Sequence, residues 1–248
     1  MSAGFRSLLA VLESGFESGG IVMGAAGFQL VRPSSCMTFG TGREPVLYPY
    51  YEDSVRNAWR TAIDRLEAET ASIGAHGVVG VSISNQSDPS NSVTQLSLLG
   101  TAVRVPGAEP LSRPFLSMLS MDDTLKLLLR GWVPCGVGVG FSAIHVHGYA
   151  ASPMWQGNLT TNAEMEVLTD GVQIARGRAE ENLRESLGPL QAAGAIASTL
   201  TLQRFGQSCG KGQGVLIEGQ MLGTAVVQYR EPAVSVSAVR SVTRGRSS

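Results

Sequence analysis

One pattern occurs twice in this chain, and this internal repeat constrains the fold more than any other feature of the sequence. A helical stretch, then Gly-Ala and a strand, a polar loop, and a strand ending in Gly-Thr-Ala-Val occupy residues 55–103 and again residues 175–226. Each copy of a repeat is one structural unit, so an unusual residue is best judged by whether its twin also has it. The sequence therefore predicts two units of similar architecture.

The length of 248 residues suits two domains of about 100 to 130 residues each. Three prolines and a glycine mark a linker between the copies, and three arginines among small residues mark a basic tail. We expect a first domain at residues 1–105, a linker at 106–114, a second domain at 115–231 and a disordered basic tail at 232–248. Each domain should bury its own small hydrophobic core.

Apolar residues recur at helical spacing in both copies. In the first copy Val55, Trp59 and Leu66 lie on one stripe of a helix over residues 50–73, and Gly74 is placed to end it. The second long helix is expected at 172–193, where Pro189 predicts a kink or an early end. Shorter helices are expected around Phe5 to Leu12 and, capped by Asp122 or Asp123, around Leu125 to Leu129. Strands are expected at 20–28, 78–83, 93–103, 132–147, 195–205 and 214–227.

These elements place the chain in the α+β class, with each helix followed by a locally paired hairpin. A formal net charge of −1 provides no field that would attract phosphate backbones, so we expect no nucleic-acid partner. No apolar run reaches the roughly 18 residues of a membrane helix, so we expect no membrane partner either. Cys36, Cys135 and Cys209 are odd in number and far apart, which favours a reducing, cytoplasmic environment.

His145 and His147 are the strongest candidates for chemistry. Alternate residues of a strand point to one face, so the two imidazoles are placed to hold a transition metal together. Zn²⁺ usually needs three or four protein ligands, so Cys36, Cys135 or a second subunit would have to complete the site. The first copy has no such pair. The alternative interpretation is that both are ordinary strand histidines that face solvent or an interface.

No catalytic set is recognisable elsewhere. Cys209 precedes a lysine in a polar loop, where a cation could lower the pKa of a thiol, but an isolated cysteine is more often a small buried hydrophobe. The glycine-rich stretches at 136–140 and 210–214 lack the spacing of nucleotide-binding loops. The helix carboxylates have arginines three or four positions away and are best explained as surface ion pairs. The sequence therefore predicts that the protein is not an enzyme.

The residues that carry the repeat also resemble a known family. Ile-Gly-Ala-His-Gly-Val-Val-Gly-Val at 73–81 and Leu-Leu-Gly-Thr-Ala-Val at 98–103 resemble the YbjQ-like, heavy-metal-binding domain family, and Gly131-Trp132-Val133 resembles its actinobacterial members with two tandem domains. The resemblance implies two dodecin-like β-α-β-β domains and assembly into a closed ring, with five two-domain chains as one way to fill it. The second copy departs from the pattern, because Ile196-Ala197-Ser198-Thr199 replaces Val-Val-Gly-Val.

Two functions follow as hypotheses from different classes. The first is a non-enzymatic, ring-forming binding or scaffold protein, because closed rings remove exposed sheet edges. The second is a transition-metal-binding or metal-sensing protein that uses His145 and His147. In either case no cofactor beyond a transition metal is expected.

Overall fold

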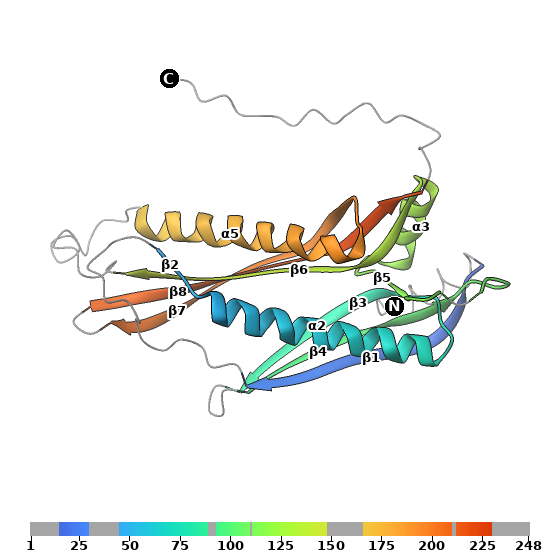
Figure 1. The fold of residues 1–248 in the computed structure, drawn as a ribbon, viewed down its shortest axis with the longest axis horizontal. Coiled ribbons are helices and arrows are strands. Elements are labelled where there is room, and N and C mark those ends of the chain that lie inside the picture. Colours follow the sequence, from blue (N-terminus) through green and yellow to red (C-terminus); the bar gives the residue numbers. More distant parts are fainter. Residues whose placement is uncertain are drawn as a thin grey trace, which may run out of the picture.

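The computed structural model describes residues 15–29, 45–88, 93–109, 111–147, 166–209 and 212–229. The expected helix at Phe5 to Leu12, Cys36 and the basic tail lie outside these residues. The described part is a mixed α+β structure, as the sequence predicts, with two mainly antiparallel sheets and helices packed against them (Figure 1).

Both halves of the chain place a strand, a long helix and a hairpin in the same order. The elements of the first half are β1 (Glu17–Gln29), β2 (Val46–Leu47), α2 (Pro49–Ser72), β3 (Gly77–Asp88) and β4 (Val93–Arg104). Those of the second half are β5 (Phe115–Leu116), α3 (Met121–Leu129), β6 (Trp132–His147), α5 (Glu166–Leu187), the 3₁₀ turn η1 (Gly188–Leu190), β7 (Gly194–Cys209) and β8 (Gly212–Gln228). Sheet A has the strand order β1-β4-β3-β5, and sheet B has the order β2-β6-β8-β7.

Each sheet contains a short strand from the other half of the chain. β2 precedes the first long helix but pairs with β6, where Val46 lies opposite His145. β5 follows the expected linker but pairs in parallel with β3, where Phe115 lies opposite Gly77. The domain boundaries stay a prediction. The expectation that strands pair only within their own half is wrong, because β2 and β5 are exchanged.

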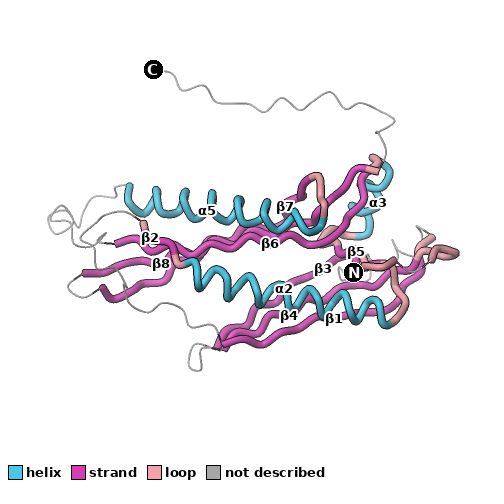
Figure 2. The backbone as a smooth tube through the Cα atoms, in the orientation of Figure 1, coloured by secondary structure: helices cyan, strands magenta, loops and turns pink. Residues whose placement is uncertain are grey.

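Helix α2 lies between the two sheets, while α5 covers the other face of sheet B (Figures 1 and 2). The layers therefore run α5, sheet B, α2, sheet A. Trp59 and Leu66 of α2 share one buried cluster with Val139 and Phe141 of β6 and with the first sheet. The expectation of two separate small cores is wrong, because α2 is covered from both sides and joins the halves.

Local signals explain where the helices begin and end. α2 starts at Pro49, whose fixed φ suits a first helical turn, and Gly74 follows its end with φ of +67°. α5 gives way at Leu187 to the 3₁₀ turn that contains Pro189, which confirms the predicted early end. In α3 the expected aspartate cap is wrong. The hydroxyl oxygen of Ser120 accepts from the Asp123 backbone N–H at 3.2 Å and caps this helix.

Two equivalent glycines allow each long helix to approach its strand. A Cβ added to Gly24 of β1 would overlap the carbonyl oxygen of Ala62 in α2, and one added to Gly140 of β6 would overlap that of Ala179 in α5. Gly24 and Gly140 therefore occupy matching places in the two halves. This close packing, and not a nucleotide-binding role, accounts for glycine in the 136–140 stretch.

The close contact at Gly140 predicts a loss of stability when a methyl group is added there. Gly140→Ala should lower the free energy of unfolding by about 1–3 kcal/mol, because the backbone of α5 must move away from β6. Gly177→Ala is the matched control: Gly177 is in the same helix and a Cβ there has open space. It should raise stability by about 0.5–1 kcal/mol. Urea unfolding followed by circular dichroism measures both, and equal effects would contradict the close-packing account.

Candidate functional site at the junction of the repeats

The two candidate histidines lie together at the end of β6. The ring centroids of His145 and His147 are 4.3 Å apart, in an edge-to-face arrangement. His145 has no exposed surface, and its Nδ1 hydrogen-bonds to the side-chain oxygen of Gln207 on β7. The Tyr48 ring lies 6.2 Å away, immediately before α2. His145 therefore faces the junction between the halves and not solvent.

The environment of His145 opposes protonation. Burial lowers the pKa of its imidazole, and the neighbouring His147 charge acts in the same direction, while the Gln207 hydrogen bond partly opposes them. A neutral imidazole is therefore the stable form inside the junction.

The described residues do not fit a closed heavy-metal site. In this part of the chain, no group of three or more His, Cys, Asp and Glu side chains is placed to hold a metal ion. Cys135 lies ten residues before His145 on the same strand (145 − 135), which places it about 33 Å away in an extended strand. Burial also raises the pKa of the Cys135 thiol, which opposes metal binding by its thiolate. The Cys209 side chain and all of Cys36 lie outside the described structure.

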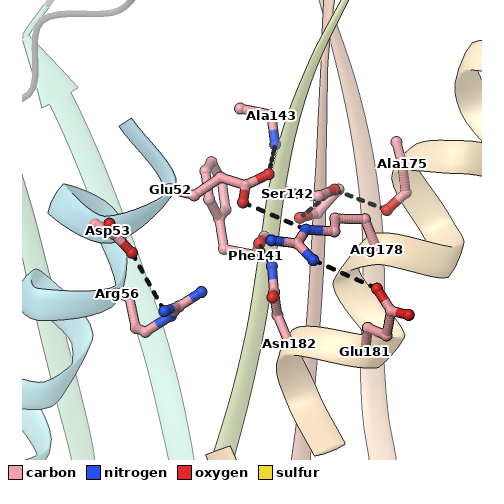
Figure 3. A network of polar contacts seen from close by, with 11 residues as sticks. Glu52, Asp53, Arg56, Phe141, Ser142, Ala143, Ala175, Arg178, Glu181 and Asn182 are labelled. Carbon is pink, nitrogen blue, oxygen red and sulfur yellow. Dashed lines mark hydrogen bonds and ion pairs between the residues drawn. The ribbon is translucent and has the colours of Figure 1, made fainter. Parts of the chain in front are cut away.

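A buried carboxylate connects the two halves, and Figure 3 shows its contacts. Glu52, in the first turn of α2, is 2% exposed and accepts from the backbone N–H of Ala143 at 2.9 Å. Its second oxygen lies 3.6 Å from Nε of Arg178, which reaches over from α5. The Glu52 carboxylate of α2 thus contacts both β6 and α5. Removing either charged partner would leave the other poorly compensated at a buried site.

Side chains from α2 and α5 also form hydrogen bonds with backbone N–H and carbonyl groups of β1 and β6. In the first half, the Glu69 carboxylate accepts from Met23 N–H at 3.0 Å and Arg65 donates to the Ala25 carbonyl at 2.5 Å. In the second half, the equivalent bonds are Ser186 to Val139 N–H at 3.0 Å and Asn182 to the Phe141 carbonyl at 2.5 Å (Figure 3). Edge groups satisfied in this way are less available for pairing with another strand.

Sheet A and sheet B match residue for residue on one face. In sheet A this is the face turned away from α2, and in sheet B it is the face turned away from α5. Met23 lies opposite Leu99 in sheet A, and Val139 lies opposite Leu222 at the same register in sheet B. One step along, Ile21 lies opposite Thr101 and Val137 opposite Thr224. We call the apolar residues of this surface in sheet A the outer patch, and it consists of Ile21, Met23 and Leu99.

Exposure separates the outer patch from its counterpart. Val137, Val139 and Leu222 are 6%, 6% and 4% exposed, because α2 covers them. Ile21, Met23 and Leu99 are 74%, 50% and 43% exposed, since the described chain provides no helix on that face. The same surface is thus buried in one half and open in the other.

Sequence reasoning placed Trp59 correctly in the core, at 2% exposure. It missed Glu52, which has no sequence signal for burial, and Arg178, whose partner lies in the other half. Asn182 carries a weak signal, because it is a polar residue beside the apolar Ala179 and Leu183 positions of α5.

Acidification should destabilise this junction through His145. Its pKa when folded lies below the unfolded value of 6.5, so the unfolded chain binds more protons between the two values. The stabilisation is therefore complete above about pH 6.5 and is lost as the pH falls towards the lowered pKa. Thermal melts at about pH 7.5 and 5.5 should show a lower Tm in acid. His145→Gln should reduce that decrease because glutamine does not titrate, and an equal decrease in both proteins would contradict this assignment.

No helix in the described ranges combines the length and hydropathy needed to cross a membrane.

The chain is 27% identical over 200 residues to the encapsulin nanocompartment protein Rv1762c of Mycobacterium tuberculosis, an alignment that covers 77% of this chain and 73% of the relative. A family model described as "Putative heavy-metal-binding" matches residues 47–106. This segment contains α2, β3 and β4 of the first repeat, so the match to the YbjQ-like family model covers the first repeat.

Proposed function

We propose that this protein is a non-enzymatic scaffold that assembles head to tail, so that α5 of one copy covers the outer patch of the next. The observation that carries the proposal is the difference in exposure between equivalent positions. Met23 is 50% exposed, whereas its counterpart Val139 is 6% exposed under α2. A second copy that repeats the α2–sheet B contact would cover the outer patch in the same way.

The side chains on α5 indicate what kind of contact this is. With Ala62 matched to Ala179, the buried Trp59 of α2 corresponds to the exposed Arg176 of α5. Around the outer patch, exposed Ser82 and Gln95 add polar surface to sheet A. The contact between copies is therefore more polar than the contact within a chain, which favours reversible, salt-sensitive assembly.

A head-to-tail contact uses two different surfaces, so it produces a ring if the rotation closes and a filament if it does not. Closure by five two-domain chains is the ring that the family resemblance implies. The M. tuberculosis relative has a name that links it to an encapsulin nanocompartment, and this supports an assembling role for the present chain. The absence of a recognisable catalytic set in the sequence supports the non-enzymatic part of the proposal.

Light scattering after size exclusion, together with native mass spectrometry, tests the contact. The parent protein should have the mass of several chains at micromolar concentration. Met23→Glu should weaken assembly at least tenfold, because it places a charge in the outer patch.

Leu200→Glu is the matched control for this test, since Leu200 is 44% exposed on β7 of sheet B, whereas the patch lies on sheet A. It should leave the mass unchanged. A monomeric parent protein, or dissociation by Leu200→Glu but not by Met23→Glu, would contradict the proposal.

A second candidate function is transition-metal binding, favoured by the contact between the His145 and His147 rings. The described residues supply no third ligand, so tight binding would require residues beyond them or a second copy. Elemental analysis of purified protein and a zinc titration, with His145→Ala/His147→Ala as the control, decide between the functions. For a scaffold we expect no stoichiometric metal. Metal that is retained by the parent protein and lost by the variant would establish the second candidate instead.

A further inference from the structure

A cavity of about 320 Å³ lies between α2 and α5, along the part of β6 that β2 does not cover. Trp59 and Ile63 line it from α2, Val137 and Val139 line it from β6, and Leu190 lines it from η1. Its size is at the lower end of the range for small-molecule sites, and its apolar walls with a few polar groups have the composition of such sites.

Asn182 gives this cavity a specific polar group. Its side chain is 1% exposed, and its amide nitrogen donates to the Phe141 carbonyl at 2.5 Å (Figure 3). This bond fixes the orientation of the amide. The Oδ1 atom is buried and has no hydrogen-bond partner among the described residues. A buried acceptor without a partner lowers stability, so a ligand that donates a hydrogen bond here would recover that loss.

The remaining lining residues give the rim a small positive charge. Three arginines, Arg56, Arg60 and Arg113, face two carboxylates, Asp64 and Glu185, which leaves one net positive charge (3 − 2).

The three arginines are not equally available. Two nitrogens of the Arg113 guanidinium, Nε and Nη2, donate to Glu67, and these hydrogen bonds raise the pKa of Arg113. They hold the Arg113 side chain at the edge of the cavity. Arg56 has an exposed 3.2 Å contact with Asp53, a type of pair that contributes little. Arg60 is exposed and has no ion pair within the described structure. Arg60 and Arg56, one helical turn apart, are therefore the cations that an anion would meet.

We propose that this cavity binds a small organic anion with an apolar, flat body and one hydrogen-bond donor. The body lies against Trp59, Val139 and Leu190, the donor meets Oδ1 of Asn182, and the anionic group meets Arg60 with Arg56 beside it. All these residues come from one chain, so the site does not rest on the proposed assembly. The repeat explains its position, because within the described residues sheet B has a long helix on each of its two faces, whereas the outer face of sheet A has none.

Titration with 8-anilinonaphthalene-1-sulfonate tests the site, since this dye has an aromatic body, a sulfonate and an N–H donor. Two variants address the two parts of the proposal. Leu190→Trp fills the apolar part of the cavity, and Arg60→Gln removes the available cation. Each should raise the Kd of the dye at least fivefold, and added salt should weaken binding to the parent protein but have less effect on Arg60→Gln.

The controls separate this site from other surfaces. Arg184→Gln removes an exposed arginine that pairs with Glu180 on the same helix, and Leu200→Ser removes an exposed apolar residue on β7. Neither should change dye binding. Light scattering on the same samples should give unchanged masses, so a failure of assembly and a failure of the site can be distinguished. A parent protein that does not bind the dye, unchanged binding in Leu190→Trp or Arg60→Gln, or loss in Leu200→Ser would each overturn the proposal.

Discussion

The burial of α2 on two sides is the constraint on which the rest of the structure depends. Ala58, Ala62 and Leu66 have no exposed surface, and Trp59 is 2% exposed. A helix with a single apolar stripe needs only one sheet, but this helix has apolar residues directed at two. Because fully burying a large apolar side chain contributes about 1.5–3 kcal/mol, separating the sheets would lose several such contributions at once. The two halves therefore share one buried core through α2.

The exchanged strands and the polar junction follow from that packing. Once α2 lies on sheet B, the chain just before it runs beside β6, where β2 pairs and where Glu52 and Tyr48 meet the backbone of Ala143. The buried Glu52 carboxylate costs free energy unless both Ala143 and Arg178 remain in place. Its role is best understood as fixing the position of α2 over sheet B, since it is satisfied only in that arrangement.

The repeat also shows which features depend on chemical identity and which depend on geometry. Glu69 and Ser186 share no side-chain class, yet each accepts a hydrogen bond from the equivalent strand N–H. Arg65 and Asn182 likewise donate to equivalent carbonyls. The glycines at 24 and 140, in contrast, are identical because a close helix–strand approach leaves no room for a Cβ. The steric limit requires the same residue type in both halves. The equivalent hydrogen bond, in contrast, can be made by any polar side chain that reaches the backbone group.

Local signals in the sequence predicted much of the fold. The ends of β6 at Trp132 and His147, the helix end at Gly74 and the early end before Pro189 all agree with the structure. These features depend on residues within a few positions of one another, so a single sequence contains them. The pairing of His145 with Val46 joins residues about a hundred positions apart, and neither has a local signal for it.

The sequence by itself determined the α+β class, the repeated order of strand, helix and hairpin, and the core position of Trp59. Periodicity and turn chemistry act over a few residues and are sufficient for these. Only the tertiary structure decided that α2 lies between both sheets, that His145 is buried, and that Met23 is exposed where Val139 is covered. The physical reason is that burial depends on what packs against a surface, and in this protein the covering element comes from the other half of the chain.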